Sequence, residues 1–270
     1  MSKITVKDFF RLKAHNEPIV IVTAYDYVFA RMVDEAGVEA ILVGDSLSMV
    51  VQGNENTLFC NIEDVIYHTR MVKRGVKNAL LIADMPFLSY QISVEEGIKN
   101  AGLLIKAGAE AVKLEGGREV VPLVEKLTSY GIPVMGHLGM TPQHVYSFGG
   151  YKLQGKTEEQ RRRIIEDAKM LEEAGVFAIV LEMIPAELSK EITEIVHVPT
   201  IGIGAGPFCD GQVLVLHDLL GLYPDFRPSF AKAYRELYKE GMEGVKEFIG
   251  EVKERKFPDE KHYFRLKKDE

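Results

Sequence analysis

The sequence predicts an α/β protein whose eight parallel strands and their helices close into a (β/α)8 barrel of the TIM type. Its 270 residues are enough for one such domain, and eight short apolar runs alternate with helical segments. Three of these units repeat one pattern, a helix-ending Ala-Gly followed by an apolar run that stops at an acid. A doubly wound open sheet rarely needs eight evenly spaced units. We therefore expect residues 1–270 to form a single barrel domain with a short N-terminal helix and a charged C-terminal tail.

The eight apolar runs define the expected strands. Most of them are continuous rather than alternating, which is typical of parallel strands covered on both faces. They lie at residues 19–23, 40–44, 79–83, 111–114, 132–136, 177–181, 199–203 and 213–216.

Capping residues mark where several of the intervening helices begin. Candidates are Asn61, Ser93 and Thr157, and the last two are each followed three residues later by a Glu or Gln that can complete a capping box. Pro185 and Pro228 are compatible with a first helical turn. We therefore expect a helix to begin near each of these five positions.

The composition argues against several classes of binding partner and cellular location. A formal net charge of −7 argues against a nucleic-acid or anionic-membrane surface as the main partner. Only Cys60 and Cys209 could form a disulfide, and two free thiols in a reducing compartment are the better expectation. The N-terminus lacks the apolar core of a signal peptide, and no apolar run is long enough to span a bilayer. We expect a cytoplasmic protein that acts on small molecules.

Three acids follow neighbouring strands of the predicted barrel. Asp45, Asp84 and Glu115 end the second, third and fourth apolar runs, and active sites of such barrels lie at the C-terminal ends of the strands. Carboxylates crowded together repel one another and need a compensating cation. Oxygen ligands without a Cys/His cluster favour a hard ion, most plausibly Mg²⁺ that keeps some of its waters. The alternative is that each acid merely caps the helix after its strand.

Other ionisable residues stand at the same strand ends. The two-residue period of a strand puts Lys113 on the same face as Glu115, where it could pair with that acid or bind an anionic substrate oxygen. Glu182 stands two strands further on, behind an apolar run, and suits a general base as well as a salt bridge at the rim. His137 is more simply a hydrogen-bonded strand-end histidine than a catalyst.

Longer motifs resemble one known family. They are Thr23-Ala24-Tyr25-Asp26, Val43-Gly44-Asp45-Ser46, Asp84-Met85-Pro86-Phe87, Lys113-Leu114-Glu115-Gly116, Gly136-His137-Leu138-Gly139-Met140-Thr141-Pro142-Gln143, Gly149-Gly150-Tyr151-Lys152, Ile201-Gly202-Ile203-Gly204-Ala205-Gly206 and Asp210-Gly211-Gln212-Val213-Leu214-Val215. In these segments the chain closely resembles ketopantoate hydroxymethyltransferase. The likeness extends from about Thr5 to the region of His262, which is almost the whole chain.

The resemblance implies a fold and an activity. The fold is a barrel of the phosphoenolpyruvate/pyruvate type. The implied reaction transfers a hydroxymethyl group from 5,10-methylenetetrahydrofolate to 3-methyl-2-oxobutanoate and gives ketopantoate, the first step of pantothenate and coenzyme A biosynthesis. The family uses one Mg²⁺ per subunit and forms homodecamers, so a homo-oligomer is expected here. A modified pterin in place of folate stays open.

The resemblance also implies roles for residues of this chain, none of which is substituted. The metal-site acids match Asp45, Asp84 and Glu115; the keto-acid contacts match Asp45, Ser46, Asp84 and Lys113; and the proton acceptor matches Glu182. His137 and Tyr25, which also stand at strand ends, are expected to support the site.

Two rival interpretations remain at this point. A related Mg²⁺-dependent lyase or mutase for 2-keto acids on the same barrel would use a cysteine-bearing loop, and neither Cys60 nor Cys209 has the Lys-Lys-Cys-Gly-His context of such a loop. A barrel that binds metal and keto acid without catalysis is disfavoured by the presence of Glu182 and Lys113.

Overall fold

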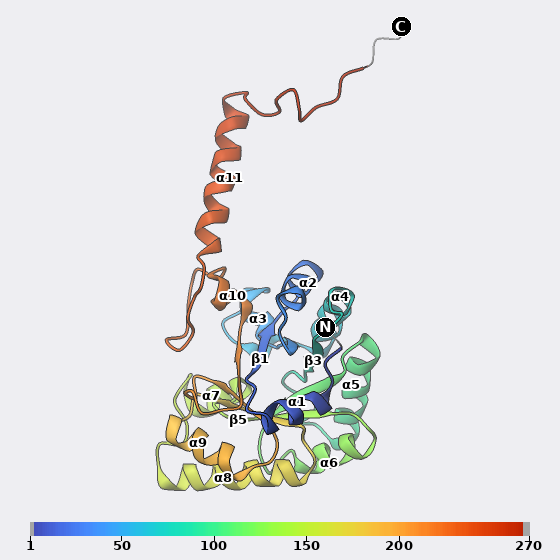
Figure 1. Cartoon of the computed structure of the whole chain (residues 1–270), viewed down its shortest axis with the longest axis vertical. Helices are drawn as coiled ribbons and strands as arrows, with labels where there is room; N and C mark the ends of the chain where they lie inside the picture. Colours follow the sequence, from blue (N-terminus) through green and yellow to red (C-terminus); the bar gives the residue numbers. More distant parts are fainter. Residues whose placement is uncertain (1–2, 267–270) are drawn as a thin grey trace. The chain divides into compact units, whose positions relative to one another are not determined.

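The computed structural model describes residues 3–266 of the chain. Eight strands form a closed barrel in the order of the sequence, and every neighbouring pair is parallel (Figure 1). The strands are β1 Ile19–Thr23, β2 Ala40–Val43, β3 Leu80–Asp84, β4 Ala111–Glu115, β5 Val134–Gly139, β6 Ala178–Glu182, β7 Thr200–Ile203 and β8 Gly211–Leu214. Each overlaps the apolar run predicted for it, and the predicted fold class is confirmed.

Helices connect neighbouring strands from β1 to β7 and cover the outside of the barrel, whereas the connection from β7 to β8, residues 204–210, contains no helix (Figure 1). The α-helices are α1 Val6–Ala14, α2 Tyr27–Ala36, α3 Leu47–Val50, α4 Ile62–Gly75, α5 Val94–Ala107, α6 Val121–Ser129, α7 Val145–Phe148, α8 Glu158–Glu173, α9 Ala186–Ile195, α10 Leu216–Leu220 and α11 Leu237–Lys253. Two short 3₁₀ helices are η1 Thr57–Phe59 and η2 Pro142–His144.

The capping predictions hold for four of the five helices. Asn61, Ser93 and Thr157 each accept the backbone N–H of the residue three positions on, and Pro185 directly precedes α9. The prediction of a helix that begins at Pro228 is wrong. The Pro228 carbonyl accepts the N–H of Ala231 in a turn, and the next helix begins only at Leu237. A proline compatible with a first turn does not by itself supply an apolar face that packs.

The repeated Ala-Gly pattern has a backbone cause. Gly37 and Gly108 cap α2 and α5, Gly175 follows the end of α8, and all three have positive φ values of 92°, 117° and 94°. This left-handed conformation is open to glycine at little cost and ends the helix. The chain then enters the next strand within a few residues, so the acid after that strand is delivered to the same end of the barrel each time.

Helix α1 closes the N-terminal end of the barrel. Phe9 and Leu12 join the buried cluster formed by inward-facing strand residues, and the Phe9 ring packs edge-on against Phe177 with centroids 5.4 Å apart. The Lys13 ammonium donates to the carbonyls of Val196 and Val198, which precede β7. With this end covered, the opposite end of the barrel is left for the ionisable residues.

The chain divides into two compact units, the first ending at Leu216 and the second beginning at His217. The second unit contains α11, none of whose residues is buried. Its large apolar side chains recur at helical spacing, at Tyr238, Met242, Val245, Phe248, Ile249 and Val252. The single domain expected over residues 1–270 stays a prediction. Within the described residues, none of the helices has both the length and the apolar character that crossing a membrane requires.

Candidate active site

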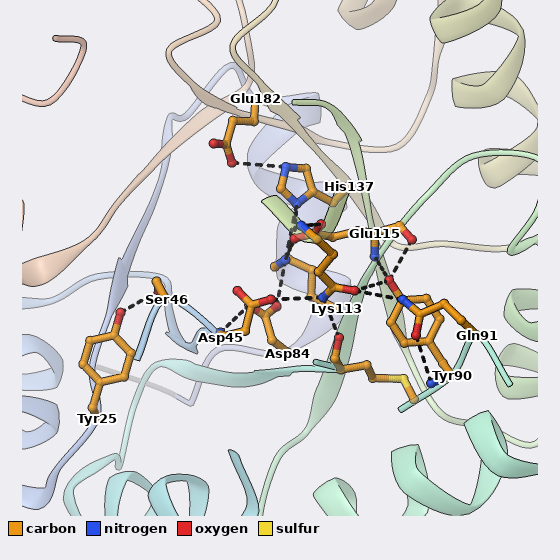
Figure 2. A network of polar contacts seen from close by, with 12 residues as sticks. Tyr25, Asp45, Ser46, Asp84, Tyr90, Gln91, Lys113, Glu115, His137 and Glu182 are labelled. Atoms are coloured by element: carbon orange, nitrogen blue, oxygen red, sulfur yellow. Dashed lines mark hydrogen bonds and ion pairs between the residues drawn. The ribbon is translucent and has the colours of Figure 1, made fainter. Parts of the chain in front are cut away.

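Three carboxylates lie together at the C-terminal ends of neighbouring strands. Asp84 is the last residue of β3 and Glu115 the last of β4, while Asp45 lies two residues beyond β2. All three are buried, with exposed fractions of 4% or less. One Asp84 oxygen, Oδ2, accepts the backbone N–H of Asp45 at 2.9 Å (Figure 2). The barrel therefore brings the three acids that the sequence singled out into one pocket.

Lys113 lies among these acids, on the same face of β4 as Glu115. Its Nζ is 2.8 Å from Asp84 Oδ1 and 3.9 Å from Glu115 Oε1, and the side chain is buried (Figure 2). Burial lowers the pKa of Lys113, but the charges of Asp84, Glu115 and Asp45 outweigh it and raise that pKa above its ordinary value. The ammonium is therefore charged at neutral pH.

The pocket holds more negative charge than Lys113 compensates. Burial, together with the charges of Asp84 and Glu115, raises the pKa of Asp45 well above its ordinary value. Burial also raises the pKa of Asp84, although Lys113 opposes this. Burial would raise the pKa of Glu115 too, but His137 and Lys113 hold it below its ordinary value. An additional cation would be favoured here.

His137 connects this pocket to Glu182. Its Nδ1 lies 3.5 Å from Glu115 Oε1 and 3.3 Å from Lys113 Nζ, and its Nε2 lies 3.3 Å from Glu182 Oε2 (Figure 2). Burial and the charge of Lys113 lower the pKa of His137, but the carboxylates of Glu115 and Glu182 raise it to about 9. The sequence suggested a hydrogen-bonded strand-end histidine that supports the site. The structure places this ring between carboxylates of two separate strands.

A glycine sets the position of Glu182 at the end of β6. Gly139, the last residue of β5, has a φ of 96°, and a Cβ at this position would collide with the Glu182 carbonyl. That carbonyl accepts the N–H of Met140 at 2.8 Å. The Glu182 backbone thus lies against β5 on one side, and Glu182 pairs with Ile203 of β7 on the other. Its side chain is 13% exposed.

Tyr25 and Ser46 form a neutral pair beside the acids. The Tyr25 hydroxyl lies 2.7 Å from Ser46 Oγ, and Ser46 directly follows Asp45 in the chain (Figure 2). Burial raises the pKa of Tyr25, so the phenol stays protonated. The pair therefore offers hydroxyl groups rather than charge.

Sequence reasoning assigned no role to Gln143 or Tyr90. The Gln143 amide nitrogen Nε2 donates to Asp45 Oδ2 at 3.0 Å, and its backbone N–H donates to Glu115 Oε2 at 2.9 Å. Its Oε1 accepts the Tyr90 hydroxyl at 2.8 Å. The only signal in the sequence was that Gln143 ends one of the longer motifs, and neither residue carries a charge that would have drawn notice.

The carboxylate oxygens of the pocket are ligands of the kind that a hard cation prefers. In the described part of the chain, no three His, Cys, Asp or Glu side chains converge on one point as a complete set of metal ligands. Mg²⁺ does not require such a set, since it usually takes one or two carboxylates and completes its shell with water or substrate. Glu115 Oε1 is buried and accepts no hydrogen bond from the described residues. These carboxylates, rich in negative charge, therefore fit Mg²⁺.

Solved structures with the same fold are distant in sequence. A phosphonopyruvate hydrolase in complex with oxalate and Mg++ has a TM-score of 0.62 at 12% identity, over 94% of this chain and 88% of that one. A 2,3-dimethylmalate lyase of the PEP mutase/isocitrate lyase superfamily has a TM-score of 0.59 at 14% identity, over 97% and 90%. At these identities the likeness shows the fold alone.

Comparison of the sequence identifies the family. The family model described as ketopantoate hydroxymethyltransferase matches residues 3–260. A 3-methyl-2-oxobutanoate hydroxymethyltransferase of Clostridium botulinum (strain Alaska E43 / Type E3) is 52% identical over 269 residues, covering 99% of this chain and 98% of the relative. One of Ignicoccus hospitalis is 56% identical over 264 residues, covering 98% and 100%. With matches that extend over nearly its whole length, this chain belongs to the ketopantoate hydroxymethyltransferase family.

Proposed function

We propose that this protein transfers a hydroxymethyl group from 5,10-methylenetetrahydrofolate to 3-methyl-2-oxobutanoate, giving ketopantoate for pantothenate and coenzyme A biosynthesis. Family membership supports the reaction, since relatives above half identity carry the name of this enzyme. The observation that carries it for this chain is the buried contact of His137 with both Glu182 and Glu115, which joins a base to an acidic, lysine-containing pocket.

The acidic pocket would receive the keto acid. Asp45, Asp84 and Glu115 would hold Mg²⁺, which when bound polarises a ketone oxygen and compensates the charge of the three acids. Lys113 would attract the anionic oxygens of the substrate, because it is a buried, charged ammonium. Ser46 lies beside Asp45 and would donate its hydroxyl to the same substrate.

Glu182 would take the proton from C3 of the keto acid. The resulting enolate carries its charge on the oxygen of C2, the former ketone oxygen, where Lys113 would stabilise it. Water hydrolyses the methylene bridge of the folate and releases tetrahydrofolate and a formaldehyde unit. The enolate carbon then forms a bond to the carbonyl carbon of formaldehyde, whose oxygen takes up a proton and becomes the new hydroxyl group. His137, held by Glu115 and Glu182, would keep the Glu182 carboxylate oriented.

The rival lyase or mutase activity receives less support. The solved lyase and hydrolase structures share the barrel at 12–14% identity, whereas the hydroxymethyltransferase relatives share more than half of the sequence. Both cysteines are free thiols. The burial of Cys60 raises the pKa of its thiol, which makes it a poor source of a reactive thiolate.

Two assays on the wild-type protein test the proposal. The first follows the loss of the C3 proton of 3-methyl-2-oxobutanoate in D₂O by NMR, with Mg²⁺ and without folate. The second adds 5,10-methylenetetrahydrofolate and measures ketopantoate. Exchange in the first assay contradicts a silent barrel, and turnover in the second contradicts a lyase. Absence of exchange with Mg²⁺ present would contradict the proposal itself.

We also propose that the protein is a homo-oligomer, a decamer as in the family. The apolar side chains of α11 support this, because exposed apolar side chains that follow one another along a helix are typical of a protein–protein contact. Light scattering coupled to size-exclusion chromatography measures the mass directly. A monomer of 30.3 kDa would contradict the oligomer.

A further inference from the structure

We propose that Gln143 is a positioning residue of the acidic pocket, and that it determines which oxygens of Asp45 and Glu115 are left for the cation. This inference rests on the metal site of the proposed function. It adds a residue to which neither the motifs nor the comparisons give a role.

Gln143 holds two of the acids with two different donors. Its side-chain Nε2 donates to Asp45 Oδ2 at 3.0 Å, and its backbone N–H donates to Glu115 Oε2 at 2.9 Å. These acids lie at the C-terminal ends of β2 and β4, while Gln143 lies in η2 after β5. One residue therefore ties the ends of three strands together. Gln143 is 4% exposed, so both bonds lie out of water.

The two bonds select one oxygen of each carboxylate. Glu115 Oε2 accepts from Gln143, so Oε1 is the oxygen turned toward the other ionisable groups. It lies 3.5 Å from His137 Nδ1 and 3.9 Å from Lys113 Nζ. At Asp45 the oxygen taken by Gln143 is Oδ2. A carboxylate whose one oxygen is held by a donor keeps its rotamer and presents the other oxygen, as ligands with supporting hydrogen bonds do.

The orientation of the Gln143 amide is itself held. Oε1 accepts from the Tyr90 hydroxyl at 2.8 Å and from Gln91 Nε2 at 2.9 Å, and Nε2 makes a second donation, to the Met85 carbonyl, at 3.0 Å. The Tyr90 hydroxyl also accepts the Glu115 N–H (Figure 2). A flipped amide would turn its oxygen toward Asp45 and lose these bonds. The donor is therefore kept facing the acid.

The test measures metal binding directly. Mn²⁺, a probe with the same oxygen preference as Mg²⁺, is titrated into chelator-treated protein and the free ion is followed by electron paramagnetic resonance. Gln143→Met keeps the size of the side chain and removes the donor to Asp45, while the backbone N–H that donates to Glu115 remains. We expect it to weaken Mn²⁺ binding by about 10–100-fold, as loss of a supporting hydrogen bond does. The KM for keto acid should rise with it, while kcat at saturating metal changes less.

Two further variants make the result specific. Gln154→Met is the same replacement in the same β5–α8 connection. Among the described residues the Gln154 side chain donates to the Lys152 carbonyl alone, so this variant should bind Mn²⁺ like the wild type. Gln143→Glu keeps the shape but faces Asp45 with a second carboxylate, so it should also bind weakly. Thermal melts in chelator establish that each variant is folded.

The outcomes separate this inference from the proposed function. If Gln143→Met binds Mn²⁺ within twofold of the wild-type affinity, or if Gln143→Glu binds it as tightly as the wild type, the role of Gln143 is wrong. The proposed function is not affected by either result. If the wild type itself binds no Mn²⁺, the metal site of the proposed function fails and the role of Gln143 fails with it.

Discussion

Oε2 of Glu182 lies 3.3 Å from Nε2 of His137, and the other nitrogen of the same ring faces Glu115. The acid proposed to take a proton and the acids proposed to hold a cation are therefore linked by one buried imidazole. Because the pKa of that imidazole is raised to about 9, it is positively charged at neutral pH. It can then attract both carboxylates at once, Glu182 through Nε2 and Glu115 through Nδ1.

The first prediction concerns Glu182. Glu182→Gln removes the base but keeps the volume of the side chain, so Mg²⁺ and keto acid should still bind while C3 exchange falls by about 10²–10⁴-fold. NMR in D₂O measures the exchange, and calorimetry measures the binding. Glu187→Gln, at an exposed acid in the first turn of α9, is the matched control. Exchange at the wild-type rate in Glu182→Gln would show that another group is the base.

The second prediction concerns His137. His137→Gln loses the cation between the two carboxylates, so the Glu182 side chain should lose its fixed orientation. We expect C3 exchange to fall on the order of 10²-fold, with a smaller change in the KM for keto acid. The same replacement at His197, whose side chain is 96% exposed, should have no effect. Equal loss of kcat and of metal affinity would instead assign His137 to the metal pocket.

Local signals were enough to predict the barrel and its acids. The Ala-Gly pattern and the apolar runs depend on neighbours in the chain, and they located the strands that end at Asp84, Glu115 and Glu182. Gln143 contacts Asp45 across 98 positions, and no local pattern encodes such a bond. For the same reason His137 could not be predicted to bridge two acids on different strands.

The third prediction is a pH dependence of stability. Asp218 is 8% exposed, and burial raises the pKa of its carboxyl from 3.8 to about 6, although the charge of Arg227 lowers it. The folded state thus binds this proton more tightly than the unfolded state does. Its contribution to stability is therefore lost as the pH rises from about 4 to about 6.

Removing this carboxyl should stabilise the protein at neutral pH. At pH 7 the free energy of unfolding of Asp218→Asn should exceed that of the wild type by at most roughly 3 kcal/mol, and this difference should close as the pH falls toward 4. Urea unfolding at pH 4.5, 5.5 and 7 measures it, with the exposed Asp225→Asn as control. A gap that is constant with pH would contradict the buried, protonated carboxyl.

The last prediction concerns Lys113, the cation among the acids. Lys113→Met leaves Asp84 and Glu115 buried without their ammonium partner, and breaking a buried ion pair in this way costs roughly 3–5 kcal/mol. In chelator, the variant should therefore melt at a lower temperature than the wild type. Added Mg²⁺ should raise its melting temperature by more than it raises that of the wild type, because the ion then compensates charges that Lys113 no longer does. Lys106→Met, at an exposed lysine in the last turn of α5, should respond to Mg²⁺ like the wild type. If Mg²⁺ stabilises Lys113→Met no more than the wild type, the cation does not bind beside these carboxylates.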